Sequence, residues 1–541
     1  MRQSRWVAVL AAGLVFSPGL LVLASDEGDV AALVNAAAST QAEKLRQGRL
    51  SYQLDQVANA HEQGRALYDR GSRPRWVDAE TGQITAIVEL REGFGPGDLS
   101  RAVAEAGGAI EGSALELVKV KLPAAGLRTL AADPAARIVR TPHYAQPKDV
   151  VSQGVKVMKA DQFISRTGDD GTGVTVAIMD AASFGGSRQL IGSELPSDTA
   201  ATPFVQNGTF TEVHGTACAE VIHDVAPGAK LVLGGFRGDE VAWAEQIDLL
   251  VGMGVDVISH SLGFDNIAAP NGKHFFARVA DSVNARGVLF VTAAGNEAQR
   301  YNTSTWSDKN RNNLLEFKGQ TENVRIYAET GAYVILRWDD AFGHSNHDYD
   351  LYVKDGGGNI VGKSEGLQSG GQDPLEGVDI PNGIAEILTV SVRHDPSSPS
   401  KSNQKLYLYV GGPSQLDPAY QTKASTLTLP ADAKGALAVG AVRYSNKKLE
   451  AFSSQGPTAD NRVKPDLTAP DGVVTVSYGD PFYGTSAATP HAAGAAALIL
   501  SHNPNLSVSA LRTALQKATA SSGNSRNNQQ GYGLIDLSKA K

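Results

Sequence analysis

The sequence predicts an α/β protein whose main domain is a doubly wound, mostly parallel sheet, with an N-terminal α+β domain and an inserted all-β sandwich. Three observations support this prediction. Short β-rich runs alternate with helical stretches over about residues 154–300, the alternation stops over about 301–423, and it resumes near residue 436. Alternating strands and helices indicate a parallel sheet covered by helices, whereas successive strands without helices indicate a sandwich.

The α/β pattern consists of apolar strands that end in polar residues, with helical segments between them. We expect strands at residues 174–180, 230–234, 255–260 and 287–294, and helices at 215–223, 241–253, 275–286, 485–501 and 507–518. In a doubly wound sheet, functional groups gather at the carboxyl ends of the strands. The residues that end these runs are therefore the first candidates for a site.

The segment that interrupts the α/β pattern is rich in strands and turn residues. Apolar runs bounded by Gly, Asn, Asp and Ser clusters occur at residues 323–328, 333–338, 349–353, 387–392 and 405–410. This is the pattern of a β-sandwich. We place the inserted domain at residues 301–425, between core segments at 147–300 and 426–541.

The segment before the core predicts a small α+β domain. Strands are expected at residues 83–90, 115–122 and 136–140, and helices at 97–106 and 125–132. This order suits a ferredoxin-like domain over residues 83–146. The preceding residues 25–82 are rich in Ala, Gln, Glu, Leu and Arg, which favours helices.

The first 24 residues have the features of a secretory signal peptide. A basic start at Arg2 and Arg5 precedes an apolar stretch from Trp6 to Ala24, and small and polar residues follow. We expect cleavage and export to an extracellular or periplasmic location. The alternative is an uncleaved membrane anchor, because the stretch is just long enough to span a bilayer. The single cysteine, Cys218, excludes an internal disulfide.

Charge and hydropathy exclude two classes of partner. The 49 basic and 57 acidic residues give a formal net charge of −8, and no long basic run occurs. A protein that neutralises nucleic-acid phosphates needs such basic clusters, so we expect no nucleic-acid partner. No later segment is apolar enough to cross a bilayer, so no membrane contact is expected once the signal is removed.

Three short motifs lie where a predicted strand and helix meet. Asp180 ends an apolar strand, His214 begins the motif His-Gly-Thr at a helix start, and Ser486 lies in Gly-Thr-Ser at the start of the small-residue helix. Each residue alone has an ordinary structural explanation: a turn, a solvated side chain or an N-cap. Their combination changes the interpretation.

A serine hydroxyl becomes a nucleophile when a base takes its proton and a carboxylate orients that base. Ser486, His214 and Asp180 supply one of each. Asn296 ends another strand in the motif Ala-Ala-Gly-Asn and offers a neutral donor to a developing oxyanion. The unpaired N–H groups and the dipole at the helix start near Ser486 also favour negative charge on a substrate oxygen.

The chain resembles the subtilisin family of serine peptidases. The motifs that carry the resemblance occur in the family's order: Val-Ala-Ile-Met-Asp180, His214-Gly-Thr, Ser261-Leu-Gly, Ala-Ala-Gly-Asn296 and Gly-Thr-Ser486-Ala-Ala-Thr-Pro. The resemblance covers about residues 150–300 and 426–541. Where the family commonly continues with Thr or Ser and then Gly after the aspartate, this chain has Ala181-Ala182-Ser183, so the hydrogen bonding of that turn is open.

The resemblance implies a serine endopeptidase acting on proteins or peptides. Ser486 would attack the scissile carbonyl, His214 would act as base and then as acid, and Asp180 would orient His214. Asn296 and the Ser486 backbone N–H would hold the oxyanion. Cys218, one helical turn after His214, is interpreted as a small buried hydrophobe.

The resemblance also implies a substrate cleft. Ser261, Leu262 and Gly263 would pair with an extended substrate backbone. Ala293, Ala294 and Gly295 would line the pocket for the residue before the cut. These small wall residues suggest a roomy apolar pocket and broad specificity.

By position and pattern, the 83–146 domain resembles the family's propeptide, an intramolecular inhibitor that leaves after cleavage between residues 140 and 154. The alternative is a permanent domain. Two other functions stay open for the core: a transpeptidase or macrocyclase using the same acyl-enzyme, and a catalytically silent binding protein.

No cofactor is expected to be required, and the metal ligands are unassigned. The insertion contains His347, Asp348 and Asp350 near three further aspartates, and it looks like β-sandwich modules of secreted peptidases, some of which bind Ca²⁺. Alternating acidic residues can supply hard oxygen ligands, but they also form turns. A structural Ca²⁺ is therefore a hypothesis.

Overall fold

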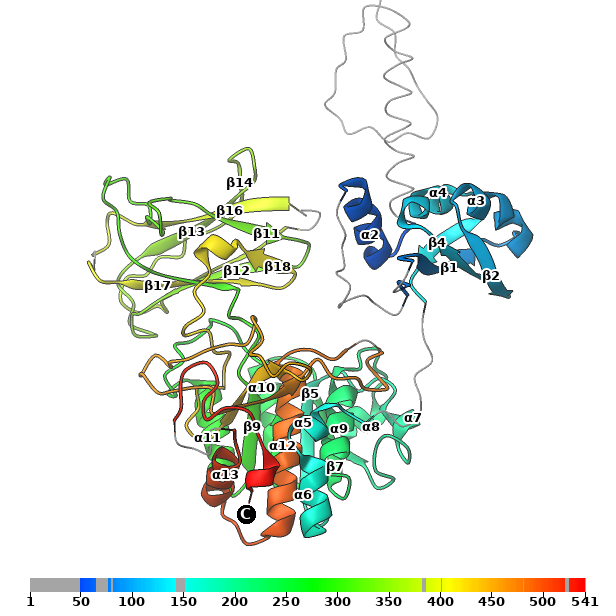
Figure 1. The fold of residues 1–541 in the computed structure, drawn as a ribbon. Coiled ribbons are helices and arrows are strands. Elements are labelled where there is room, and N and C mark those ends of the chain that lie inside the picture. The colour runs from blue at the N-terminus through cyan, green and yellow to red at the C-terminus, as the bar shows by residue number, and fades with distance from the viewer. Residues whose placement is uncertain are drawn as a thin grey trace, which may run out of the picture. The chain divides into compact units, whose positions relative to one another are not determined.

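The computed structural model describes residues 49–64, 76–78, 81–142, 151–381, 386–399, 401–479, 481–520 and 525–540. The predicted signal peptide, most of the helical segment after it and most of the expected cleavage region lie outside these residues. The chain divides into two compact units, Met1–Ala145 and Gln146–Lys541 (Figure 1).

The first unit is built on a four-stranded antiparallel sheet in the order β2-β3-β1-β4. Its elements are α2 (Tyr52–Glu62), β1 (Ile84–Leu90), α3 (Ser100–Glu105), β2 (Ala109–Ala114), β3 (Leu117–Leu122), α4 (Leu127–Ala132) and β4 (Ala136–Arg140). Alternate residues of β1 are buried, as the sequence pattern predicts. Strand β2 was not predicted, because all six of its residues are exposed and it has no apolar alternation.

The core of the second unit is a seven-stranded parallel sheet in the order β20-β19-β9-β8-β5-β7-β6. Its strands are β5 (Thr175–Ala181), β6 (Ala200–Ala201), β7 (Lys230–Phe236), β8 (Val257–His260), β9 (Leu289–Ala293), β19 (Leu437–Arg443) and β20 (Leu467–Asp471). This sheet confirms the predicted α/β core.

Helices cover both faces of the sheet. They are α5 (Gly154–Val157), α6 (Ala160–Thr167), α7 (Ser187–Leu190), α8 (Pro203–Asn207), α9 (His214–Val225), α10 (Glu240–Gly252), α11 (Phe275–Ala285), α12 (Thr485–His502) and α13 (Val508–Lys517). Val176 and Ile178 of β5 pack in the cluster that contains α9 and α12 residues. Ala177 and Met179 pack in the cluster of α10 and α11 residues, as the two-residue period of a strand requires.

The insertion follows β9 and consists of two antiparallel sheets, ordered β10-β17-β12-β15 and β14-β13-β16-β11-β18. Its strands are β10 (Tyr301–Thr305), β11 (Val324–Ala328), β12 (Tyr333–Trp338), β13 (Tyr349–Lys354), β14 (Ile360–Ser364), β15 (Leu375–Asp379), β16 (Glu386–His394), β17 (Lys405–Gly411) and β18 (Ser414–Leu416). The inward residues of both sheets form one hydrophobic cluster. The all-β insertion is therefore confirmed.

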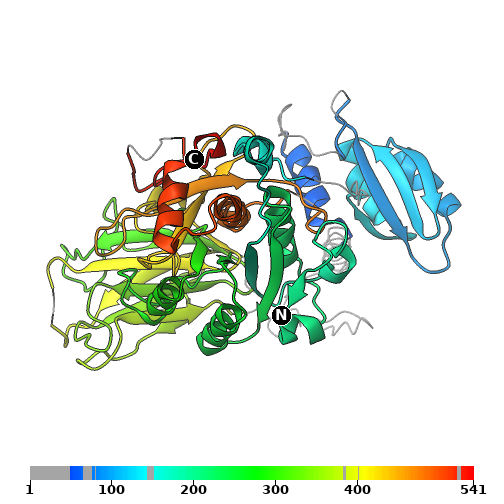
Figure 2. The ribbon, with the colours of Figure 1, turned by 90° about the horizontal axis from the view of Figure 1, so that it is seen from below.

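Helix α12, seen nearly end-on in Figure 2, packs against α9 and five strands of the core sheet. Its residues from Thr485 to Ile499 are almost all buried, and most are Ala, Gly or Thr. A Cβ placed on Gly494 would lie 2.7 Å from the Val225 Cβ at the end of α9. The small side chains therefore set how closely the two helices approach.

We expect Gly494→Ala to destabilise the protein by about 1–3 kcal/mol, because the added methyl group has no space between α12 and α9. Gly252→Ala is the matched control. A Cβ there meets no atom within 4 Å at the end of α10, so this change should be neutral or stabilise by up to about 1 kcal/mol. Urea denaturation of both variants measures the difference, and equal free energies of unfolding would contradict the packing argument.

Candidate active site

Asp180 lies at the carboxyl end of β5, and its side chain is 2% exposed. Its Oδ1 accepts hydrogen bonds from the Ala181 backbone N–H (2.8 Å) and the Ser183 hydroxyl (2.6 Å). Ala182 takes a positive φ of 53° in the turn between them. The hydrogen bonding of the Ala181-Ala182-Ser183 turn, which the sequence left open, thus consists of two donors to Asp180. They stabilise the Asp180 carboxylate and fix its direction.

His214 is the first residue of α9, and its Nδ1 lies 2.6 Å from Asp180 Oδ2. The Ser183 hydroxyl also accepts a hydrogen bond from the Gly215 N–H at 3.0 Å, which ties the β5 turn to the start of the helix. Burial opposes a charge on the His214 ring, but the Asp180 charge and hydrogen bond outweigh it and raise the pKa of His214. The contact with Asp180 places the Nδ1 proton on this side and leaves Nε2 as the basic atom.

Ser486 is the second residue of α12, which follows the N-cap Gly484. Gly484 has a φ of 110°, a conformation that favours glycine. The Ser486 N–H has no hydrogen-bond acceptor among the described residues, as is normal in the first turn of a helix. The helix start therefore offers a backbone donor and a favourable dipole beside the Ser486 hydroxyl.

Pro490 changes the hydrogen bonding of the first turn of α12. It lacks the N–H that would otherwise bond to the Ser486 carbonyl four residues earlier. That carbonyl instead accepts from the Ser261 hydroxyl at 3.0 Å, and the Cys218 thiol is directed at it with a sulfur–oxygen distance of 3.6 Å. The Cys218 thiol is fully buried, and burial raises its pKa well above the ordinary value, so it is a neutral thiol.

The Ser486 hydroxyl donates to the Ser261 carbonyl at 3.2 Å. The described residues include no hydrogen bond between this hydroxyl and His214. Both side chains nevertheless line one cavity together with Asp180. A serine hydroxyl reorients by rotation about one bond, and such contacts often tighten only when substrate is bound.

Asn296 follows β9, and its amide is oriented by Thr485. Its Oδ1 accepts from the Thr485 backbone N–H (2.9 Å) and the Thr485 hydroxyl (3.0 Å). Because the oxygen is occupied, the amide nitrogen is the atom left to act as a donor. The Asn296 amide and the start of α12 thus present N–H groups suited to an anionic oxygen.

The cavity around these residues has a volume of about 360 Å³ and contains all but one of the predicted site residues. Its lining includes Asp180, His214, Ser261, Leu262, Gly263, Ala293, Gly295, Asn296 and Ser486. Ala294 is the exception: it is fully buried in a small cluster with Leu427, Ala431 and Ala438. The Ala294 backbone N–H donates to the Val439 carbonyl, and the Ala294 carbonyl accepts from the Thr428 N–H. Ala294 therefore supports the cavity wall without lining it.

Seven residues that line the cavity were not among the predicted site residues: Ala181, Ser183, Glu212, Asp265, Glu297, Thr428 and Thr485. Because they include the polar residues Asp265, Glu297 and Thr428, the expected apolar pocket is wrong. Asp265 and Glu297 directly follow the two motifs that were recognised, but nothing in their local sequence distinguishes them from surface acids. Thr428 lies beyond the insertion and reaches the site only through the tertiary fold.

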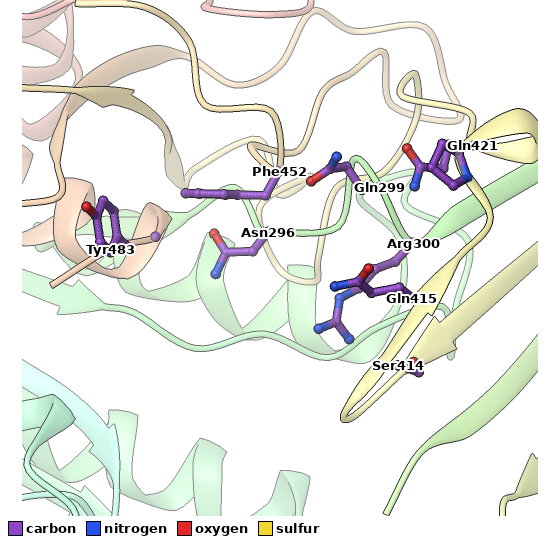
Figure 3. Close-up of a pocket in the computed structure, with 10 residues that line it drawn as sticks. Asn296, Gln299, Arg300, Ser414, Gln415, Gln421, Phe452 and Tyr483 are labelled. Atoms are coloured by element: carbon purple, nitrogen blue, oxygen red, sulfur yellow. The ribbon is translucent and has the colours of Figure 1, made fainter. Parts of the chain in front are cut away.

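A second cavity, of about 460 Å³, also has Asn296 in its lining. Figure 3 shows Asn296, Phe452 and Tyr483 toward one end of it and Gln415 and Gln421 toward the other. The insertion therefore contributes side chains to a polar wall beside the site, and a ligand extending past Asn296 would meet it.

The sequence profile of the Subtilase family matches residues 200–330 and 400–533. His214, Asn296 and Ser486 fall within the matched segments, and Asp180 precedes them. The chain belongs to the subtilase family. This confirms the resemblance to subtilisin-like serine peptidases that the sequence motifs indicated.

Curated subtilases match over a shorter stretch. Subtilisin E of Bacillus subtilis (strain 168) is 40% identical over 116 residues, which are 21% of this chain and 29% of the relative. Bacillopeptidase F of the same organism is 36% identical over 117 residues, 20% of this chain and 8% of the relative. The match thus spans under a third of these relatives' own length.

The fold matches that of a solved protease. The CspB protease of Clostridium perfringens superposes with a TM-score of 0.50 at 16% sequence identity, covering 72% of this chain and 98% of that protein. At this level of identity the likeness concerns the fold alone.

The acidic residues of the insertion mostly have protein partners. Asp340 bonds to His347 and Ser345, and Asp339 pairs with Lys401. The buried Asp348 Oδ1 is without a partner. Within the described ranges, the one close group of three metal-ligating side chains consists of Asp180, His214 and Cys218. A structural Ca²⁺ in the insertion stays a prediction, tested by comparing the unfolding temperature with and without a chelator.

We expect Asn296→Ala to reduce kcat by about 10²–10³-fold, the loss known for removing the equivalent donor of subtilisin. The start of α12 would still stabilise the oxyanion, so activity should fall without disappearing. Asn359→Ala, in an exposed turn of the insertion, is the matched control and should leave kcat unchanged. Peptide-hydrolysis kinetics measure both, and an unaffected Asn296 variant would contradict the donor role.

Proposed function

We propose that this chain is a secreted serine endopeptidase that hydrolyses peptide bonds through an acyl-enzyme on Ser486. The observation that carries the proposal is the Asp180–His214 contact of 2.6 Å within the cavity that Ser486 also lines. The family membership gives the same reaction class. A silent binding protein would not need this complete set of groups.

In the proposed reaction, the Ser486 hydroxyl turns from the Ser261 carbonyl toward His214 and attacks the scissile carbonyl carbon. His214 Nε2 takes the proton, and Asp180 stabilises the imidazolium that results. The carbonyl oxygen becomes an oxyanion that accepts hydrogen bonds from the Asn296 amide and the Ser486 N–H. His214 then protonates the leaving amine, and water cleaves the acyl-enzyme by the same steps.

Strand addition would position the substrate. The backbone from Ser261 to Gly263 borders the cavity, and an extended peptide pairing with this edge would present its carbonyl to Ser486. Ala293 and Gly295 also line the cavity. The side chain before the cut would enter between these two backbone segments.

Secretion and zymogen processing belong to the proposal. Residues 1–24 would direct export, and the 83–146 domain would act as an intramolecular inhibitor that is released by cleavage between residues 140 and 154. The first unit forms its own hydrophobic core, as a separable domain must. None of the described helices is long and apolar enough to cross a membrane.

The test expresses the full chain and its Ser486→Ala variant. The wild type should lose its N-terminal segment and hydrolyse casein, and a serine-directed reagent should block both casein hydrolysis and further processing. The Ser486→Ala chain should keep its full mass and be inactive. Joined rather than hydrolysed peptide products would favour a transpeptidase or macrocyclase. A wild type that neither processes itself nor cuts any peptide would reject the protease.

The acid limb of the pH–activity profile should lie above the ordinary histidine value of about 6.5, because the pKa of His214 is raised and the base must be neutral. As the pH falls through that raised pKa, His214 binds a proton and kcat/KM declines. Asp180→Asn removes the interactions that raise the pKa, so its limb should move to lower pH while kcat falls by about 10⁴-fold. A profile that is flat from pH 5 to 8 would contradict the assignment of His214 as the base.

A further inference from the structure

Besides Asp180 and Glu212, two further carboxylates line the cavity that holds Ser486. Asp265 follows the Ser261–Gly263 edge, and Glu297 follows Asn296. The Glu297 side chain is only 13% exposed. Both acids therefore come from the two backbone segments between which the substrate side chain would enter.

Tyr409, from the insertion, lies within hydrogen-bond distance of both acids. The Tyr409 hydroxyl, on β17, lies 3.1 Å from Asp265 Oδ2 and 3.0 Å from Glu297 Oε2. Tyr409 is 2% exposed. A phenol has one proton and donates it to one carboxylate at a time, so the pair lacks a full set of protein donors.

The nearby charges leave the pair with an excess of one negative charge when both acids are ionised. Arg300 Nε lies 3.5 Å from Glu297 Oε2, and Arg300 also donates to the Gly412 carbonyl at 2.8 Å. The remaining titratable groups that act on the pair, Tyr301 and Tyr333, are phenols whose pKa values burial raises, and they stay neutral. Among the described residues, Arg300 is thus the one basic group whose charge acts on both Asp265 and Glu297.

One carboxylate oxygen of the pair has no hydrogen-bond partner. Asp265 Oδ1 is buried and unpaired. The neighbouring Thr428 hydroxyl points at the Phe264 carbonyl, 3.4 Å away. A buried carboxylate oxygen without a donor is costly unless a ligand supplies one. A cation entering the cavity would supply both the donor and the missing charge.

We propose that Asp265 and Glu297 bind the ammonium or guanidinium group of a lysine or arginine, so that the enzyme cuts after basic residues. This inference rests on the proposed peptidase function and adds its substrate class. The small residues Gly263, Ala293 and Gly295 leave room for a long side chain to pass between the walls toward the acids. Arg300 reduces the charge of the pair without cancelling it.

The pKa values of the two acids are consistent with this role. Burial raises the pKa of Asp265, and the hydrogen bond from Tyr409 and the Arg300 charge only partly oppose this. Burial, followed by the charge of Asp265, also raises the pKa of Glu297. A bound cation would favour the ionised forms, whereas a purely structural pair would share a proton and show no preference for charge.

The test uses peptides that differ only in the residue before the cut: lysine, its uncharged analogue norleucine, arginine and its uncharged analogue citrulline. The wild type should prefer lysine over norleucine, and arginine over citrulline, by about 10- to 100-fold in kcat/KM, the range of a charge-assisted hydrogen bond. Asp265→Asn and Glu297→Gln should each reduce these ratios, and the double variant should bring them close to one.

Two controls separate selectivity from folding. Cleavage of the norleucine peptide should persist in all variants, which shows that the catalytic groups are intact. Asp248→Asn removes an exposed carboxylate on α10, 70% exposed in its side chain, and should leave the lysine-to-norleucine ratio unchanged. A wild-type ratio near one, or ratios unaffected by the Asp265 and Glu297 changes, would overturn the proposal.

Binding to the Ser486→Ala chain distinguishes this proposal from the proposed function. If that chain binds the lysine peptide more tightly than the norleucine peptide while the wild type cleaves neither, the cation site is supported and the peptidase function is rejected. If the wild type cleaves both equally and the Ser486→Ala chain binds both equally, the peptidase stands and the cation site is rejected.

Discussion

The close packing of α12 against α9 is the constraint on which the site depends. His214 begins α9 and Ser486 lies in the first turn of α12, so the distance between the two helices helps to set the position of the proposed base and nucleophile. Gly494 and the alanines of α12 permit this approach. The burial of a long helix of small residues therefore has a catalytic consequence, because larger side chains would move Ser486 away from the sheet.

The hydrogen bonds of the site show how local irregularities are compensated. Pro490 removes a helical donor, and Ser261 and Cys218 take its place at the Ser486 carbonyl. Ser183 supplies a donor to Asp180 and an acceptor to the start of α9. Thr485 occupies the oxygen of Asn296. In each case a small hydroxyl or thiol fixes a neighbouring group, which leaves the reacting atoms free for substrate.

The insertion is part of the site's chemistry as well as an added domain. It begins a few residues after Asn296 in the sequence. Its strand β17 places the Tyr409 hydroxyl within hydrogen-bond distance of Asp265 and Glu297, which line the cavity. Arg300, just before β10, donates a hydrogen bond to the carbonyl of Gly412, which follows β17. The proposed substrate preference of the core would thereby depend on a domain that lies between Asn296 and Ser486 in the sequence.

The sequence by itself determined the α/β core, the all-β insertion, and the catalytic candidates Asp180, His214, Asn296 and Ser486. These follow from local signals: apolar periodicity, and polar residues at strand ends and helix starts. It could not reveal short exposed strands such as β2, because they lack that periodicity.

Only the tertiary structure decided which residues meet across long separations. Tyr409 lies 112 residues from Glu297 and 144 from Asp265, and their contact exists because the insertion folds back onto the core. In the structure Ala294 is buried in a hydrophobic cluster, although the sequence placed it in the pocket lining. The pocket that the sequence predicted to be apolar is lined by the carboxylates Asp265 and Glu297 as well. The energy of a buried charge depends on the charges and hydrogen-bond partners around it, and packing in three dimensions decides which groups those are.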